Sequence, residues 1–246
     1  MKVKMKILVT AGLSMLLSTN IAIAQSSGMA DDNKMKDNPK MKMMTDIKNW
    51  PDASKLAAAE ITEKYGMPDE ATEHMLVWYN NGPWKRTVIY NMETKHIFPV
   101  DHADVMEQFI DYNVPEDKYD ELAMYDGSVT VRRTDGEMSA KCDKEGANFL
   151  AINLANDVAT GKKNVEEARA FYAKTIKEFA LENKMAPYLK EFQFKVDKKG
   201  TEDADKRAFS TEENEKITAA MKKKNMEMME KMKMEMEKMK AEMDNK

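Results

Sequence analysis

Alternation of apolar and polar residues is clearest over residues 128–142, on both sides of an Asp-Gly pair at 135–136. Such a pair between alternating segments is typical of a two-residue β-turn, because both central residues need a positive φ. This turn predicts a hairpin in which Val131 lies opposite Ala140. The residues predicted on its buried face are Val129, Val131, Met138, Ala140 and Cys142.

A second hairpin is predicted from residues 73–79 and 84–91, joined by a turn at the Asn-Gly pair 81–82. This turn would place Tyr79 opposite Trp84. Large apolar residues alternate onto both faces of the first strand, which is typical of a central strand buried on two sides. Two further strands are predicted over residues 95–98 and 188–196.

Helical spacing of apolar residues predicts five helices in the central region. The first begins with Asp52 as the expected cap and ends before Gly66, with Leu56 among its inward residues. In the last of the five, Asn164 and Glu167 have the spacing of a capping box. The predicted ranges are residues 52–65, 104–111, 116–124, 143–160 (with Asp143 as its cap) and 164–179.

The composition changes to Met, Lys and Glu over residues 210–246, which contain no Gly or Pro. One long helix is predicted here. Its methionines repeat at spacings of three and four, which is the apolar seam of a coiled coil, so we expect weak self-association through this helix. The seam consists of Met229, Met232, Met236, Met239 and Met243.

These elements together predict an α+β fold. It is a single domain with an antiparallel sheet of hairpins packed against an antiparallel helix pair, plus a long C-terminal helix. The predicted organisation is a signal peptide over residues 1–24, a disordered leader over 25–49, a globular domain over 50–200, and a charged loop and C-terminal helix over 201–246.

The first 24 residues have a basic start, an apolar run and small residues before Gln25, which is the pattern of a secretory signal peptide. We expect cleavage after Ala24, a periplasmic or secreted protein, and no membrane span in the mature chain. Because these residues contain three lysines and no acids, cleavage moves the net charge from −4 to −7. An acidic chain of this kind is not expected to bind nucleic acid.

Cys142 is the only cysteine, so no disulfide forms within the chain. Its position on the apolar face of the first hairpin predicts a buried, unreactive thiol, since reactive thiols need exposed and electropositive surroundings.

Two histidines, His96 and His102, lie close together in the sequence with Asp101 and Asp104 beside them. Imidazole and carboxylate groups bind divalent metals and act in acid-base chemistry, so a metal-assisted hydrolase is one alternative for the function. Their spacing does not match the His-Glu-x-x-His signature of zinc hydrolases. The alternative to a metal or catalytic site is that these side chains have a structural role. Acidic residues at 104, 107 and 111 would share one face of the predicted helix as a solvated surface.

Methionine is the compositional anomaly, with 24 residues concentrated in the leader and the C-terminal helix. Thioethers are soft ligands that select Cu(I), so copper handling is a second alternative for the function. Methionine is also a good helix former that fills apolar seams. The candidate ligands in the C-terminal helix are Met228, Met232, Met236 and Met239.

No catalytic or cofactor-binding signature occurs in the sequence. The sequence therefore predicts an exported, non-catalytic binding or interaction protein of the cell envelope. The alternative hypotheses are a copper-handling protein and a metal-assisted hydrolase.

Overall fold

The computed structural model describes Met43, residues 46–197 and residues 199–244. The predicted signal peptide and most of the predicted leader lie outside this part of the chain. Met43 and Ile47, which the sequence analysis assigned to a disordered leader, are both buried against Ala58 and Ile61 of the first helix. The packed region therefore begins upstream of Trp50.

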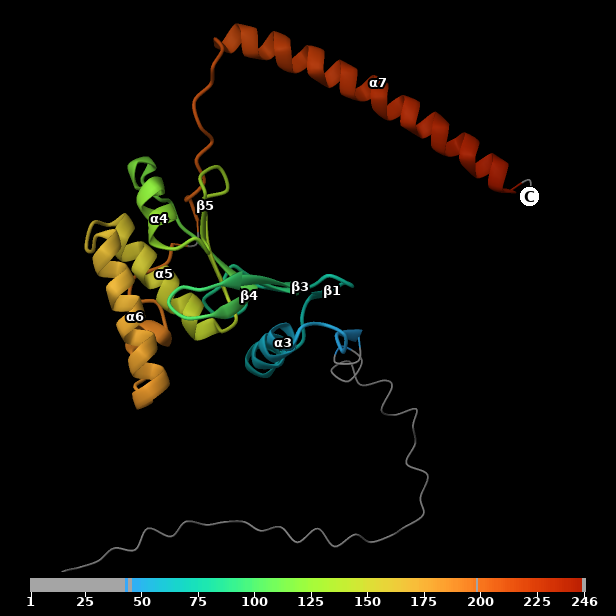
Figure 1. Ribbon diagram of the computed structural model, residues 1–246. Helices are drawn as coiled ribbons and strands as arrows, with labels where there is room; N and C mark the ends of the chain where they lie inside the picture. Colours follow the sequence, from blue (N-terminus) through green and yellow to red (C-terminus); the bar gives the residue numbers. More distant parts are fainter. Residues whose placement is uncertain (1–42, 44–45, 198, 245–246) are drawn as a thin grey trace, which may run out of the picture. The chain divides into compact units, whose positions relative to one another are not determined.

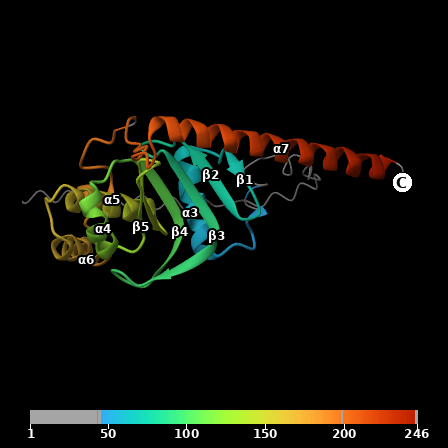
Figure 2. The ribbon, with the colours of Figure 1, turned by 90° about the horizontal axis from the view of Figure 1, so that it is seen from above.

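The fold is α+β, as predicted, and contains one antiparallel sheet of six strands in the order β1-β2-β3-β4-β6-β5. Figure 2 shows β1 to β4 next to one another in this order. The strands are β1 (Glu70–Ala71), β2 (Met75–Tyr79), β3 (Arg86–His96), β4 (His102–Asp111), β5 (Val129–Arg132) and β6 (Glu137–Cys142).

Helices pack on one face of this sheet. One core cluster joins α3 to the strand residues Leu76, Ile89 and Met106. Another joins α5 to Ile110 and Met138. The strand pairing places these five side chains on the same face of the sheet. Helix α5 also contacts both α4 and α6 (Figure 1). The helices are α3 (Asp52–Tyr65), α4 (Tyr119–Tyr125), α5 (Glu145–Ala159), α6 (Val165–Glu182) and α7 (Thr211–Asp244), with 3-10 turns η1 (Glu116–Lys118) and η2 (Pro187–Leu189).

The helix predicted over residues 104–111 is wrong, because this segment is strand β4, between β3 and β6. Val105, Met106, Phe109 and Ile110 are spaced like the apolar stripe of a helix, but all four are buried in the sheet. A strand buried on both faces loses its alternation and cannot be told from a helix by periodicity.

The β5–β6 hairpin keeps the predicted faces, but its predicted register is wrong by two residues. Val131 lies opposite Met138, and the loop has four residues. Gly136 has φ +61° and donates its N–H to the Arg133 carbonyl at 3.1 Å. The Arg133 carbonyl also accepts the N–H of Asp203, so a distant segment holds the loop open.

The predicted register of the β2–β3 hairpin is also wrong by two residues, in the opposite direction. Tyr79 lies opposite Arg86 instead of Trp84, because residues 80–85 form the loop. Trp84 is 2% exposed and belongs to the core cluster of α5. Because its indole is buried among the helices, Trp84 is not part of strand β3.

The strand predicted over residues 188–196 is also wrong. After η2 the chain is irregular, and it hydrogen bonds to a side chain instead of to a strand. Asn153 of α5 donates to the carbonyl oxygens of Tyr188 and Glu191 at 3.1 and 2.8 Å, and it accepts the N–H of Gln193 at 2.7 Å. Phe192 packs edge-on against Trp84, with ring centroids 4.9 Å apart.

Helix ends match the predictions in part. The capping box of Asn164 and Glu167 is confirmed by two reciprocal hydrogen bonds of 2.9 Å. Asp52 and Asp143 are not the N-caps of their helices, whose caps are Pro51 and Lys144. Leu56 was expected to face inward and is 64% exposed.

The long C-terminal helix is confirmed as α7, and none of its residues is buried. The methionines of its predicted seam are therefore exposed. No helix in the part of the chain that the structure describes is both long and apolar enough to cross a membrane.

Candidate functional site

Strands β3 and β4 bring His96 and His102 together at their shared end. The two histidines are direct partners in the antiparallel register, and their ring centroids lie 4.8 Å apart. The five residues between them form the β3–β4 loop. His74, the third histidine, is exposed near the start of β2 and is not part of this group.

Asp104 completes the group, and it is 4% exposed. Its Oδ1 lies 3.1 Å from His102 Nε2, and its Oδ2 lies 3.4 Å from His96 Nδ1. The Ser128 hydroxyl, which precedes β5, contacts His96 Nδ1 at 3.0 Å and donates to Asp104 Oδ2. We call His96, His102 and Asp104 the histidine cluster. Asp101 was expected nearby and is exposed in the loop instead.

The orientation of the His102 ring is fixed from both sides. Its Nδ1 lies 2.8 Å from the carbonyl oxygen of Val100, so Nε2 faces Asp104. Asp104 and then Cys142 raise the pKa of His102 to about 11. Burial raises the pKa of Asp126, whose carboxylate lies 3.8 Å from His96 Nε2.

A cavity of about 640 Å³ opens next to this cluster, and His102 and Cys142 line one end of it. We call it the α5–α6 cavity. Its apolar wall consists of Pro99, Val100, Ala147, Phe149, Tyr172, Ile176, Phe179, Ala180, Met185 and Leu189. Its polar lining includes Glu60, Lys64, Asp101, Asp143, Lys144, Glu145 and Lys190.

Glu145 holds the polar side of this cavity in place. It is 3% exposed and accepts hydrogen bonds from Trp84 Nε1 and from the Tyr65 hydroxyl, both at 2.7 Å. Lys64 forms an ion pair with the same carboxylate. Sequence reasoning missed this network, because an acidic residue in a first helical turn is ordinary and its three partners come from α3 and the β2–β3 loop.

Cys142 is buried, as predicted, and its pKa is raised because burial disfavours the thiolate. Its thiol donates weakly to Asp143 Oδ1 at 3.5 Å. A thiol with a raised pKa is a poor nucleophile. Cys142 therefore contributes a soft, neutral surface to the end of the α5–α6 cavity.

The predicted acidic face does not exist, because its residues lie on a strand. Asp104 is in the histidine cluster, Glu107 accepts from Ser139 at 2.7 Å, and Asp111 pairs with Lys85 at 2.6 Å. The methionines considered for copper, Met228, Met232, Met236 and Met239, are all exposed on α7. Met232 and Met236 lie together beside a shallow apolar hollow on that helix.

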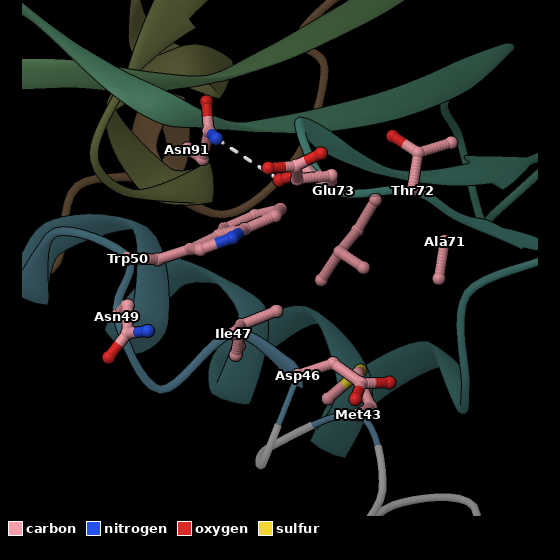
Figure 3. Close-up of a pocket in the computed structure, with 10 residues that line it drawn as sticks. Met43, Asp46, Ile47, Asn49, Trp50, Ala71, Thr72, Glu73 and Asn91 are labelled. Atoms are coloured by element: carbon pink, nitrogen blue, oxygen red, sulfur yellow. Dashed lines mark hydrogen bonds between the residues drawn. The ribbon is translucent and has the colours of Figure 1, made fainter.

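A second cavity, of about 560 Å³, lies between Trp50 and the start of β2 (Figure 3). Asn91 donates to the backbone carbonyl of Glu73 at 3.0 Å on its wall. The carboxylates of Asp46 and Glu73 are its only ionisable lining groups among the described residues. It has fewer converging chemical groups than the α5–α6 cavity.

Comparison of the chain with known protein families, with curated proteins and with solved structures finds no match.

Proposed function

We propose that the protein is an exported, non-catalytic binding protein that holds a small amphipathic molecule in the α5–α6 cavity. The observation that carries this proposal is the cavity itself, with its apolar wall and its polar end at His102 and Asp143. Small-molecule sites typically have volumes of about 300–1,000 Å³ and combine an apolar lining with a few polar groups. The sequence pattern of the first 24 residues supports export.

The shape of the lining indicates the kind of ligand. Phe149, Ile176 and Phe179 offer apolar surface from α5 and α6, which favours a ligand with an apolar body. The ionisable groups gather where α5 begins, so a polar head group on the ligand would lie at that end. Lys64 and Lys144 are already paired there with acidic side chains, which limits any net charge offered to the ligand.

The chemistry of the cavity also favours binding over catalysis. Its thiol has a raised pKa, and His102 contacts the Asp104 carboxylate. Among the described lining residues, Cys142 is the one thiol, and burial disfavours its reactive thiolate form.

Binding of the neutral fluorescent probe N-phenyl-1-naphthylamine tests the proposal. We expect saturable fluorescence enhancement with the full chain. Ala180→Trp adds a bulky ring at the cavity lining from α6, and it should weaken the affinity by about tenfold, which corresponds to about 1.4 kcal/mol.

Ala170→Trp is the matched control, since Ala170 is exposed on the same helix and does not line the cavity. It should leave the affinity unchanged. Equal affinities of both variants and the unmodified chain would show that the probe binds elsewhere and would contradict the proposal.

A further inference from the structure

One oxygen of Asp104 has no hydrogen-bond partner in the part of the chain that the structure describes. This atom, Oδ1, is buried, and the nearby Nε2 of His102 lies at 3.1 Å without the alignment of a hydrogen bond. Leaving a buried carboxylate oxygen without a donor is costly, so such an atom indicates an absent partner. A cation beside Oδ1 would supply that partner.

We propose that His96, His102 and Asp104 bind one divalent transition-metal ion of the zinc class. The ligand atoms of the three side chains all lie within 4.8 Å of one another. Metal bonds of about 2.0–2.2 Å in a tetrahedron place neighbouring ligand atoms about 3.3–3.6 Å apart. The separation of 3.1 Å between His102 Nε2 and Asp104 Oδ1 is close to this spacing. His96 reaches the other oxygen of the same carboxylate, with Nδ1 lying 3.4 Å from Oδ2.

The surroundings orient these side chains as in a metal site. The Val100 carbonyl accepts from Nδ1 of His102, which leaves Nε2 facing Asp104. Metal-binding histidines commonly donate their second ring N–H to a carbonyl in this way. A metal ion bound at Nε2 would displace the proton that the raised pKa of His102 keeps there. The Ser128 hydroxyl donates to Oδ2 of Asp104, so Oδ1 stays available to the ion.

The ligand types select the class of ion. Two imidazoles and one carboxylate match the ligands of zinc sites with an open fourth position. Calcium and magnesium prefer oxygen ligands alone, and Cu(I) prefers thioethers and thiolates. The ion can enter from the α5–α6 cavity, because His102 is part of its wall. This inference does not depend on the proposed function, since the three ligands exist whether or not the cavity holds a small molecule.

Metal titration of the full chain tests the inference. After EDTA treatment and its removal, we expect one equivalent of Zn²⁺ to bind, and Co²⁺ to give the intense visible absorption of a tetrahedral site. His96→Ala, His102→Ala and Asp104→Asn should each weaken Zn²⁺ binding by about 100-fold or more, since loss of an outer partner alone costs about 10- to 100-fold.

His74→Ala is the control, because this histidine is exposed and outside the cluster, and it should bind as the unmodified chain does. Circular dichroism shows whether each variant folds. If a variant is unfolded, the Co²⁺ spectrum of the unmodified chain decides alone. No visible band, or tight Zn²⁺ binding that survives all three substitutions in folded variants, would overturn the inference.

Discussion

The indole N–H of Trp84 donates a hydrogen bond to the Glu145 carboxylate at 2.7 Å, although the two residues lie 61 positions apart in the sequence. The Tyr65 hydroxyl donates to the same oxygen. One buried carboxylate thus connects the β2–β3 loop, the end of α3 and the first turn of α5. Of these elements, α3 and α5 line the polar end of the α5–α6 cavity with Lys64 and Glu145.

Removing one donor from this carboxylate should destabilise the fold. Trp84→Phe leaves Glu145 buried with fewer partners, and a lost hydrogen bond to a charged group costs about 1.5–3 kcal/mol. Trp78→Phe is the matched control, because Trp78 is equally buried and its N–H donates to the neutral carbonyl of Gly66. Urea unfolding should show a larger loss for Trp84→Phe, and the reverse order would contradict the role given to Glu145.

Stability should fall in acid because of Glu137. Burial would raise its pKa, but hydrogen bonds from Arg86 and Lys85 outweigh burial and lower the pKa to about 2 from the ordinary 4.5. The folded protein therefore binds this proton less readily than the unfolded chain does. The resulting stabilisation is complete above pH 4.5 and is lost as the pH falls toward 2; it is at most about 3 kcal/mol.

Glu137→Gln removes this contribution, so its free energy of unfolding should change less between pH 4.5 and 2 than that of the unmodified chain. Glu73→Gln changes an exposed glutamate and should keep the original acid dependence. Identical pH profiles for Glu137→Gln and the unmodified chain would argue against the ion pair.

The two faces of β5 should respond differently to a negative charge. Val129 is 8% exposed and lies opposite Ala140, so Val129→Asp buries an unpaired carboxylate and should cost more than about 3 kcal/mol. Val131 is half-buried and should tolerate Asp better, and Thr130→Asp on the exposed side should cost least. Thermal melts of the three variants check this order, and a Thr130→Asp variant less stable than Val129→Asp would refute the assigned faces.

Helix α7 should self-associate weakly through its exposed methionine seam. Met232 and Met236 lie on that seam, whereas Met234 lies on the opposite side of the heptad repeat. Sedimentation of the full chain should show a concentration-dependent dimer. The double substitution Met232→Lys and Met236→Lys should abolish it, and Met234→Lys should preserve it. A monomer at all concentrations would exclude this role for the seam.

The fold class could be predicted from the sequence because the alternation in β2, β5 and β6 and the periodicity of α5 and α6 are local properties. The hairpin registers could not be predicted from the sequence, because contacts with distant residues set them. The N–H of Asp203 binds the β5–β6 loop at the Arg133 carbonyl, and the Trp84 side chain turns toward Glu145. Strand β4 was mistaken for a helix because it is buried on both faces.

The same error hid the histidine cluster. His96, His102 and Asp104 were recognised as neighbours in the sequence, but only the pairing of β3 with β4 places their ligand atoms together. The α5–α6 cavity could not be predicted at all, because its wall combines α3, the β3–β4 loop, α5 and α6. No local pattern carries that information.

Nuclear Overhauser effects between N-phenyl-1-naphthylamine and the methyl groups of the full chain test the binding function most directly. We expect contacts from the probe to the methyl groups of Val100, Ile176 and Met185, which line the α5–α6 cavity. Contacts to the exposed methionines of α7 alone, or no contact to these three residues at saturating probe, would contradict it.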